Sequence, residues 1–329
     1  IAINKLNKTK TYLMETVLGL FFVGSSICLS SVTEVNEVLS IIKRRENLLE
    51  SDKSYSASFQ MLNQACMFDP RQGDVRIEGT ITWRKDNLCM KMLYSYLQNP
   101  IYVSPDTGIY KQIDYDRNRR LILWRPLEKY ILSTLERTEI VDIYQLFFVS
   151  PEGEFEQSED LYRIKHIFPS DCPLDGTYEF KHFLMASGIG FLHYLEPNSP
   201  PEIEPVKNTV FRLKYSGNYG KEVKGVWELI LDPNTFFFVQ HALFTNEKMV
   251  TPSVEVSTSR VVIDGPLHYA SQGTLVFSGM TRKRYEKIKI FAGDNLELRQ
   301  EVYQKIKEEL SGTDIVEFTG KKPVRIFMK

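Results

Sequence analysis

The sequence lacks an excess of charge of either sign, since its 329 residues contain 41 lysines and arginines against 42 aspartates and glutamates. The formal net charge of -1 produces no overall field that would attract nucleic acid or an anionic membrane. Two short basic clusters, 117–120 and 282–284, lie beside turn or polar residues and are better explained as solvated surface than as phosphate sites. We therefore expect no nucleic-acid partner and peripheral or no membrane association.

Motifs of the common enzyme classes are also missing. A nucleophile elbow, a phosphate loop and a dinucleotide fingerprint are absent, and the nearest glycine pair, Gly188 and Gly190, falls inside a helical stretch. His182 and His193 would share a face of an unbroken helix, but no carboxylate or cysteine stands beside them at metal-ligand spacing. We expect no catalytic residue, no metal site, no cofactor and no enzymatic activity. A hydrolase with two carboxylates converging in a cleft is the enzymatic alternative.

Long apolar runs are missing except near the N-terminus. Lys5, Lys8 and Lys10 precede the apolar run 17–24, and small serines follow it, which is the layout of a secretory signal. The run is too short to span ~30 Å of hydrocarbon, which takes about 20 residues, and no other stretch approaches that length. We expect residues 1–30 to be a signal peptide or an N-terminal anchor, with a buried helix as the third alternative. The protein is expected to be exported to the periplasm or outer cell envelope of a bacterium.

Cysteine is scarce, with four residues in the whole chain. Cys28 follows the apolar run, but Ile27 stands where a bacterial lipobox has a small residue, which disfavours acylation of this cysteine. Cys66 and Cys89 lie on or near neighbouring predicted strands, so they either form a disulfide in an oxidising compartment or remain buried thiols. Both a soluble and a lipid-tethered form of the exported protein are compatible with this pattern.

The periodicity of apolar residues changes early in the chain. Helical spacing across 33–50 predicts an amphipathic helix. From residue 55 the period is two, and short strands separated by tight turns predict an antiparallel meander. The strands expected in this meander are 56–61, 75–83, 88–94, 108–115 and 120–124.

The rest of the chain mixes both periods. Helices are predicted over 127–149, 178–195 and 299–310, the second interrupted by its two glycines, and a polar loop over 151–160. Further strands are predicted over 161–168, 209–215, 254–263, 274–277, 315–318 and 324–327, with a hairpin over 225–244.

Two stretches carry a resemblance to a known family: MASGIGFLHY at 185–194, and WELILDP at 227–233 with a strand returning over 236–244. With the order of elements, they resemble the periplasmic lipoprotein carriers, the LolA/LolB-like family of outer membrane lipoprotein-sorting-like proteins. The resemblance implies an α+β fold in which a curved antiparallel sheet forms an incomplete β-barrel covered by helices. It implies a half-barrel domain over 31–280. Residues 281–329, a C-terminal helix with short strands, have no counterpart in it.

Strand alternation sends apolar side chains of neighbouring strands to one face of the expected sheet. If the helices stand off from this face, its side chains line a slot in which an acyl chain gains ~0.8 kcal/mol per buried methylene. Methionine suits such a wall because its thioether chain adapts to variable shapes. The expected ligand-binding residues are Ile81, Trp83, Met90, Met92, Tyr94, Ile113, Tyr115, Trp227 and Leu229.

The sequence therefore predicts an exported cell-envelope protein that holds a lipid or a lipoprotein acyl chain in an apolar half-barrel. Its expected partners are a lipid or an acylated protein, together with an envelope protein. The alternative is a structural or interaction protein of the envelope, in which the same core is filled and no ligand binds. An enclosed apolar cavity of about 300 Å³ or more between sheet and helices favours the first function, and a filled interior favours the second.

Overall fold

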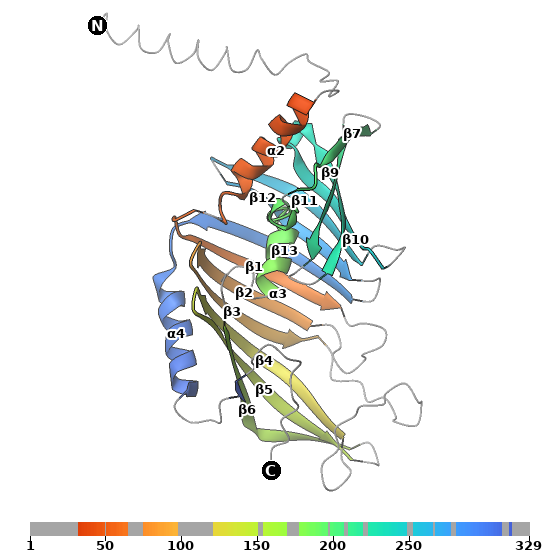
Figure 1. Ribbon diagram of the computed structural model, residues 1–329. Helices are drawn as coiled ribbons and strands as arrows, with labels where there is room; N and C mark the ends of the chain where they lie inside the picture. Colours follow the sequence, from red (N-terminus) through yellow and green to blue (C-terminus); the bar gives the residue numbers. More distant parts are fainter. Residues whose placement is uncertain are drawn as a thin grey trace, which may run out of the picture.

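One sheet of fourteen strands dominates the computed structural model of the protein (Figure 1). The two-residue β14 (Val316–Glu317) runs parallel to β6 (Phe155–Pro169), and the other strands are antiparallel to their neighbours. The structure describes residues 32–49, 51–64, 75–97, 121–150, 154–169, 178–196, 198–206, 210–219, 223–248, 253–265, 267–277, 281–310 and 316–317.

The sheet consists of two meanders, in each of which every strand pairs with the next one along the chain. The first comprises β1 (Tyr55–Gln64), β2 (Val75–Arg84), β3 (Asn87–Tyr96), β4 (Leu121–Thr134), β5 (Arg137–Val149) and β6. The second comprises β7 (Glu202–Val206), β8 (Val210–Tyr219), β9 (Val223–Asp232), β10 (Phe238–Asn246), β11 (Val254–Asp264), β12 (Leu267–Phe277) and β13 (Thr281–Ala292). Pairing of β1 with β13 joins the two meanders, with Tyr55 opposite Ala292 and Met61 opposite Tyr285.

The sheet is open. Its strand order runs from β14 to β7, and no pairing joins these two edges within the described residues. Figure 1 shows that the sheet curves and that its strands twist progressively from β7 to β6. The predicted α+β fold, a curved antiparallel sheet that forms an incomplete barrel covered by helices, is confirmed. Because β13 lies in the middle of the sheet, the strand pairing continues beyond residue 280.

Helices lie on both faces of the sheet. α2 (Val32–Glu46) and α3 (Tyr178–Ala186) lie on the concave face, which we call the inner face, and α3 contacts β11 and β12. α4 (Leu296–Leu310) lies on the outer face and contacts β2 to β6. A 3₁₀ turn, η2 (Leu192–Tyr194), follows α3, and a second, η3 (Pro233–Thr235), links β9 to β10. Every helix in the described part of the chain is too short or too polar to cross a membrane.

Alternation along the strands produces two apolar cores. In β1, Phe59 and Met61 are buried on the inner face, whereas Ser58 and Gln60 face a groove on the outer face. Inner-face side chains form one large cluster with α2 and α3. A smaller cluster lies under α4 and contains Cys89, Tyr130, Val141, Ile143, Leu298, Val302 and Ile306.

Cys89 in the outer cluster is a free, buried thiol. Burial raises the pKa of this thiol to about 11, so it stays protonated and unreactive near neutral pH. Its suggested disulfide partner, Cys66, lies outside the described residues. The predicted signal at 1–30 and the predicted strands 108–115 and 324–327 also lie outside them.

The helix predicted over 127–149 is wrong, because this segment forms the β4–β5 hairpin. The reason is that β5 is covered on both faces. Val141 and Ile143 pack under α4, while Ile140 packs against the inner core, so apolar residues occupy both phases of the strand and period two is lost. The polar loop predicted over 151–160 is also partly wrong, since β6 begins at Phe155.

Candidate functional site

The inner face of β2 and β3 carries the first group of predicted ligand-binding residues. They lie side by side, since Ile81 on β2 pairs with Met90 on β3. All of them belong to, or pack against, the large inner core. Ile81, Trp83, Met90 and Met92 are at most 1% exposed, and Tyr94 is half-buried.

Trp83 shows how this part of the inner face is filled. Its ring centroid lies 5.5 Å from that of Phe180 and 6.2 Å from that of Phe183, both on α3, and 5.7 Å from that of Tyr55. Its indole Nε1 donates to the carbonyl oxygen of Leu48, just after α2, at 3.2 Å. Here α3 does not stand off from the sheet, and the side chains form packed core. Their role as a ligand wall stays a prediction.

The second group of predicted residues lies on β9, in the other meander. Trp227 and Leu229 are fully buried in the same core. The Trp227 ring centroid lies 5.7 Å from that of Phe191, just before η2, in an edge-on arrangement. Ile113 and Tyr115, the remaining predicted residues, lie outside the described part of the chain.

Buried polar contacts hold α2 in place over this face. The Arg45 guanidinium donates to the carbonyl oxygen of Phe237 at 3.2 Å. The Glu46 carboxylate accepts the backbone N–H groups of Phe191 at 2.9 Å and Leu192 at 3.1 Å. Burial raises the pKa of the Glu46 carboxyl, and these contacts oppose the rise. α2 is therefore tied both to the β9–β10 turn and to the segment that follows α3.

The C-terminal end of α3 sits directly on β12. Gly188 takes a left-handed φ of 75° and ends the helix, which explains why the helix predicted over 178–195 stops at Ala186. The N–H of Ala270 on β12 donates to the carbonyl oxygen of Ser187 at 2.9 Å. A Cβ atom at Gly273 would lie 2.1 Å from the carbonyl oxygen of Ala186, so only glycine permits this close approach.

A charged cluster lies where α3 begins. The Lys129 ammonium on β4 is 2.7 Å from the Glu179 carboxylate on α3 and 3.4 Å from the Asp142 carboxylate on β5. Burial disfavours the ammonium, but the two carboxylates outweigh it and raise the pKa of Lys129. Burial likewise opposes the charge of Glu179, yet Lys129 lowers the pKa of that carboxyl. Lys129 pairs across the strands with buried Met92, so charge adjoins the apolar wall.

His182 on α3 forms a second polar group beside the core. Its Nδ1 lies 3.1 Å from the Lys283 ammonium and its Nε2 lies 2.8 Å from the Tyr219 hydroxyl. Burial, and then the charge of Lys283, lower the pKa of His182 to about 3, so the imidazole is neutral near pH 7. Nδ1 then accepts from Lys283 while Nε2 donates to Tyr219. Burial also lowers the pKa of Lys283.

We expect the free energy of unfolding to fall as the pH drops from about 6.5 towards 3. In this window the unfolded chain binds a proton at residue 182 that the folded protein, with its His182 pKa of about 3, does not bind. One such proton lowers stability by about 1.4 kcal/mol per pH unit. Denaturant titrations of wild type and His182→Gln across this window should show a shallower pH slope in the variant.

Tyr219→Phe is the matched control for this pH effect. It removes a hydrogen bond to His182 but keeps the buried imidazole, so the slope should persist. Equal slopes in wild type and His182→Gln would contradict the assignment of the pH dependence to this histidine.

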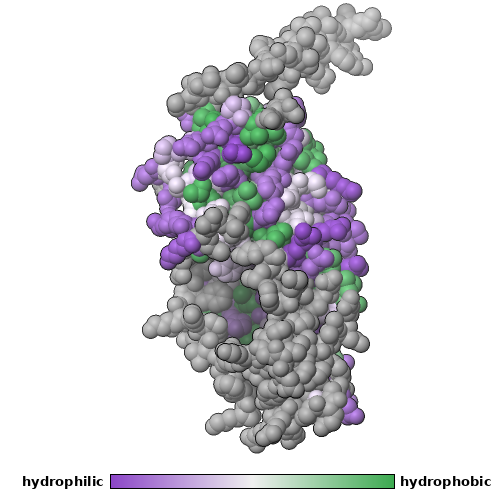
Figure 2. All heavy atoms as spheres, turned by 90° about the vertical axis from the view of Figure 1, so that its right-hand side faces the viewer, coloured by the Kyte–Doolittle hydropathy of each residue, from purple (hydrophilic) through white to green (hydrophobic). Residues whose placement is uncertain are grey.

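Beyond the charged cluster, the inner face continues over β4 to β6. Ile140 and Tyr144 on β5 and His166 on β6 are half-buried there, and α4, which contacts these strands, lies on the outer face. Figure 2 shows a hollow near the middle of the molecule, with hydrophobic and hydrophilic residues visible inside it. On this face an apolar wall therefore adjoins a charged centre.

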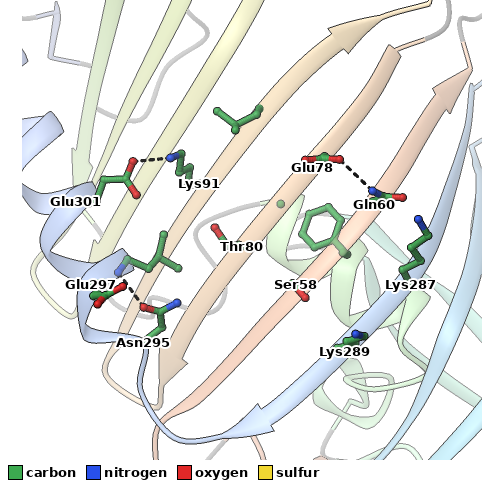
Figure 3. Close-up of a pocket in the computed structure, with 14 residues that line it drawn as sticks. Ser58, Gln60, Glu78, Thr80, Lys91, Lys287, Lys289, Asn295, Glu297 and Glu301 are labelled. Carbon is green, nitrogen blue, oxygen red and sulfur yellow. Dashed lines mark hydrogen bonds and ion pairs between the residues drawn. The ribbon is translucent and has the colours of Figure 1, made fainter.

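The outer face has a different character. A groove of about 500 Å³ lies between α4 and the strands β13, β1, β2 and β3 (Figure 3). Lys91 and Glu301 form an ion pair at its α4 side, and Gln60 donates to Glu78 at 3.0 Å on its floor. Its charged lining is balanced, with Lys91, Lys287, Lys289, Glu78, Glu297 and Glu301. A polar partner fits this groove better than an acyl chain, since burying these groups against hydrocarbon is costly.

A β-bulge in β13 places two lysines on the rim of this outer groove. The register with β1 shifts between Ser58 and Gln60, and Lys287 takes a left-handed φ of 52°. Ile288 stays buried on the inner face while Lys287 and Lys289 both reach the groove. Among the described residues neither lysine has an ion-pair partner, so both ammonium groups are free to meet carboxylates of a partner.

The hydrolase alternative requires two carboxylates that converge in a cleft. Asp142 and Glu179 do converge, but on the ammonium group of Lys129. Glycosidase pairs keep about 5 Å or more between their carboxyl groups and leave that space to the substrate or to water. Here Lys129 occupies the space. Over the ranges that the structure describes, no group of three or more His, Cys, Asp or Glu side chains is arranged to hold a metal ion.

Sequence reasoning missed the charged cluster, although one signal was present. Lys129 and Lys283 occupy inward positions of their strands, in phase with the buried Ile131 and Tyr285. A charged side chain at an inward position needs a partner. The inward positions of these two lysines therefore indicate a polar site within the apolar face. The identity of the partners does not follow from it, because they come from other elements.

The fold and this inner face define an open, helix-covered antiparallel half-barrel. No family model and no curated protein matches the sequence. Among solved structures, the chain is similar to a DUF1329 family protein from Desulfovibrio piger, with 10% identity, a TM-score of 0.37 and coverage of 78% of this chain and 92% of that one. It is also similar to a LolA superfamily protein from Nitrosomonas europaea, with 8% identity, a TM-score of 0.40 and coverage of 78% and 94%. Both similarities concern the fold alone.

Proposed function

We propose that this protein is an exported, non-enzymatic binding protein of the bacterial cell envelope that holds a lipid or a lipoprotein acyl chain on its inner face. The supporting observation is the meeting of a continuous apolar wall with a charged cluster on that face, at Met92 and Lys129. The acyl chain lies along the wall, where each buried methylene contributes ~0.8 kcal/mol. The polar end of the ligand lies near Lys129 and Lys283.

Binding requires α3 to move away from the sheet, since its side chains pack against the wall. Phe180 and Phe183 contact Trp83, and an acyl chain takes their place when α3 lifts. Lifting α3, which has only nine residues, also breaks its polar contacts with the sheet, which include the Glu179–Lys129 ion pair, the contacts of His182, and the hydrogen bond from Ala270 to Ser187 just after the helix.

Native mass spectrometry of protein purified from membrane-containing cells tests this function. Wild type should carry a lipid-sized adduct. Met92→Asp should lose it, because the substitution places a carboxylate on the apolar wall. Leu93→Asp is the matched control, since Leu93 is the next residue on β3, is 38% exposed and lines the outer groove.

Two outcomes would count against lipid binding on the inner face. The first is repeated absence of lipid from wild-type preparations that have been exposed to membranes. The second is unchanged lipid loading in a Met92→Asp variant whose circular dichroism matches wild type. Trp83→Asp provides a second position on the same wall.

A filled inner core and the polar outer groove favour a second candidate function, that of a structural or interaction protein of the envelope. In that case Lys287 and Lys289 meet a partner chain and no lipid binds. Three results together would support this candidate. Wild-type protein would carry no lipid but would capture an envelope partner, Lys287→Glu would lose this capture, and Met92→Asp would retain it.

A further inference from the structure

A separate pocket of about 430 Å³ lies where α2 meets the β9–β10 turn and the start of β12. Its lining is Ile41, Arg44 and Arg45 from α2, Phe236 from the turn and His268 from β12. None of these residues belongs to the charged cluster around Lys129. A volume of this size is about fourteen times the ~30 Å³ that one water molecule occupies in the liquid. It accommodates a small charged group with a short apolar extension.

The pocket contains two guanidinium groups and no carboxylate among its described lining residues. Arg45 is 5% exposed, and its guanidinium lies 4.9 Å from the ring centroid of Phe238. It donates to the carbonyl oxygens of Phe236 and Phe237, while its Nε has no hydrogen-bond partner within the described structure. Burial lowers the pKa of Arg45 to about 10, so it remains a cation near neutral pH.

The neighbouring acid does not neutralise this cation by a direct bond. Both oxygens of Glu46 are turned towards backbone N–H groups of Phe191 and Leu192. Arg44, on the exposed side of α2, has no ion-pair partner in the described part of the chain. The pocket therefore presents one buried guanidinium, whose charge Glu46 compensates only through space, and one exposed guanidinium, and neither forms an ion pair within the described residues.

The apolar wall of the pocket is held in a strained conformation. Phe236 and Phe237 both take left-handed φ angles, 56° and 55°, which bulky side chains rarely adopt. Phe236 is 45% exposed, and its ring centroid lies 5.4 Å from that of His268. An exposed aromatic ring held by strained backbone contributes little to the core, and such strain is typical of ligand clamps.

We propose that this pocket binds an anionic single-chain amphiphile, such as an alkyl phosphate or a fatty-acid carboxylate. The anion lies between Arg44 and Arg45, and the first part of the chain packs against Ile41 and Phe236. Guanidinium groups suit both anions because they form paired, charge-assisted hydrogen bonds with them. The inference goes beyond the proposed function, because the pocket can fill whether or not the inner face takes up an acyl chain.

Calorimetric titration of the full chain with octyl phosphate, inorganic phosphate and octyl glucoside tests this site. Octyl phosphate should bind to this pocket both in wild type and in Met92→Asp, whose inner face no longer takes up a chain. To Met92→Asp, inorganic phosphate should bind at least tenfold more weakly, because it lacks the chain, and octyl glucoside, which lacks the charge, should give no saturable binding at the same concentrations.

Variants of exposed residues assign the binding to this pocket without threatening the fold. Arg44→Gln should weaken octyl phosphate binding about tenfold, as expected for the loss of one charge-assisted hydrogen bond. Phe236→Gly suits the left-handed backbone and should weaken octyl phosphate but not inorganic phosphate. Arg282→Gln, which removes an exposed arginine of β13 outside the pocket, should leave the affinity unchanged.

The proposal is overturned if octyl phosphate shows no saturable binding, or if wild type and Arg44→Gln bind it equally. Equal affinity for inorganic phosphate and octyl phosphate would show that the alkyl chain does not contribute to binding, which contradicts the proposed contact with Ile41 and Phe236. Met92→Asp separates this site from the inner face, since it should abolish the lipid adduct and leave octyl phosphate binding intact. Each proposal can therefore fail without the other.

Discussion

Gly273→Ala is expected to displace the C-terminal end of α3 from the sheet and to lower the free energy of unfolding by about 3 kcal/mol. The new Cβ atom would lie 2.1 Å from the carbonyl oxygen of Ala186 and 2.7 Å from its Cα, and these are backbone atoms that cannot rotate away. Moving α3 also stretches the hydrogen bond from Ala270 to Ser187. Denaturant titration measures the loss of stability, and binding of a hydrophobic dye reports the exposure of the inner face.

Gly265→Ala is the matched control for the Gly273 substitution. Gly265 also sits in the second meander and has a left-handed φ of 56°, but a Cβ atom there meets nothing within 4 Å. Its replacement should cost about 1 kcal/mol from backbone strain alone and should not increase dye binding. If the two variants have the same stability and the same dye binding, the close approach of α3 to β12 does not determine the position of the helix on the sheet.

The Gly273 variant also connects stability with the proposed function. If α3 is the movable cover of the inner face, loosening it makes the wall around Trp83 accessible and should accelerate uptake of lipid by delipidated protein. Faster uptake together with lower stability would indicate that the interactions that hold α3 against the sheet also oppose entry of the ligand. Unchanged uptake with the expected loss of stability would mean that lipid, if it binds, enters elsewhere.

Strands with one polar face could be predicted from the sequence, and strands with two apolar faces could not. β1 alternates buried Phe59 with Ser58 and Gln60, and its period of two is plain. In β5, Ile140 faces the inner core and Val141 faces α4, so the same rule gives a helix. The position of α4 on the outer face is the missing information, because it makes both phases of β5 apolar.

Alternation along the strands predicts which residues of the candidate site point to the inner face. Met92 lies on such an inward position and is buried in the inner core, while its role in ligand binding stays a prediction. The charged half depends on Lys129, Asp142 and Glu179, which lie on β4, β5 and α3 and meet only when the chain has folded. No spacing in the sequence indicates such a meeting, since α3 approaches β4 through the tertiary fold and not through the chain.

Lys129→Met is expected to lower the free energy of unfolding by about 3–5 kcal/mol at pH 7, because it leaves two carboxylates without their cation. Asp142 is 7% and Glu179 is 27% exposed at the side chain, so water replaces the lost ammonium only in part. The deficit relative to wild type should shrink as the pH falls towards 4, since the uncompensated carboxylates then bind protons more readily in the folded protein than in the unfolded chain. Denaturant titrations at several pH values measure both effects.

Lys214→Met provides the matched control, since it removes an ammonium 3.9 Å from Glu228 at a site where the two side chains are 49% and 36% exposed. An exposed pair of this kind contributes at most about 1 kcal/mol. The triple variant Lys129→Met, Asp142→Asn, Glu179→Gln should recover much of the loss, because it removes the repulsion together with the attraction. A Lys129→Met variant as stable as Lys214→Met would show that the cluster is well hydrated, and the inner face would then lack the dry, charged centre on which the lipid-binding proposal depends.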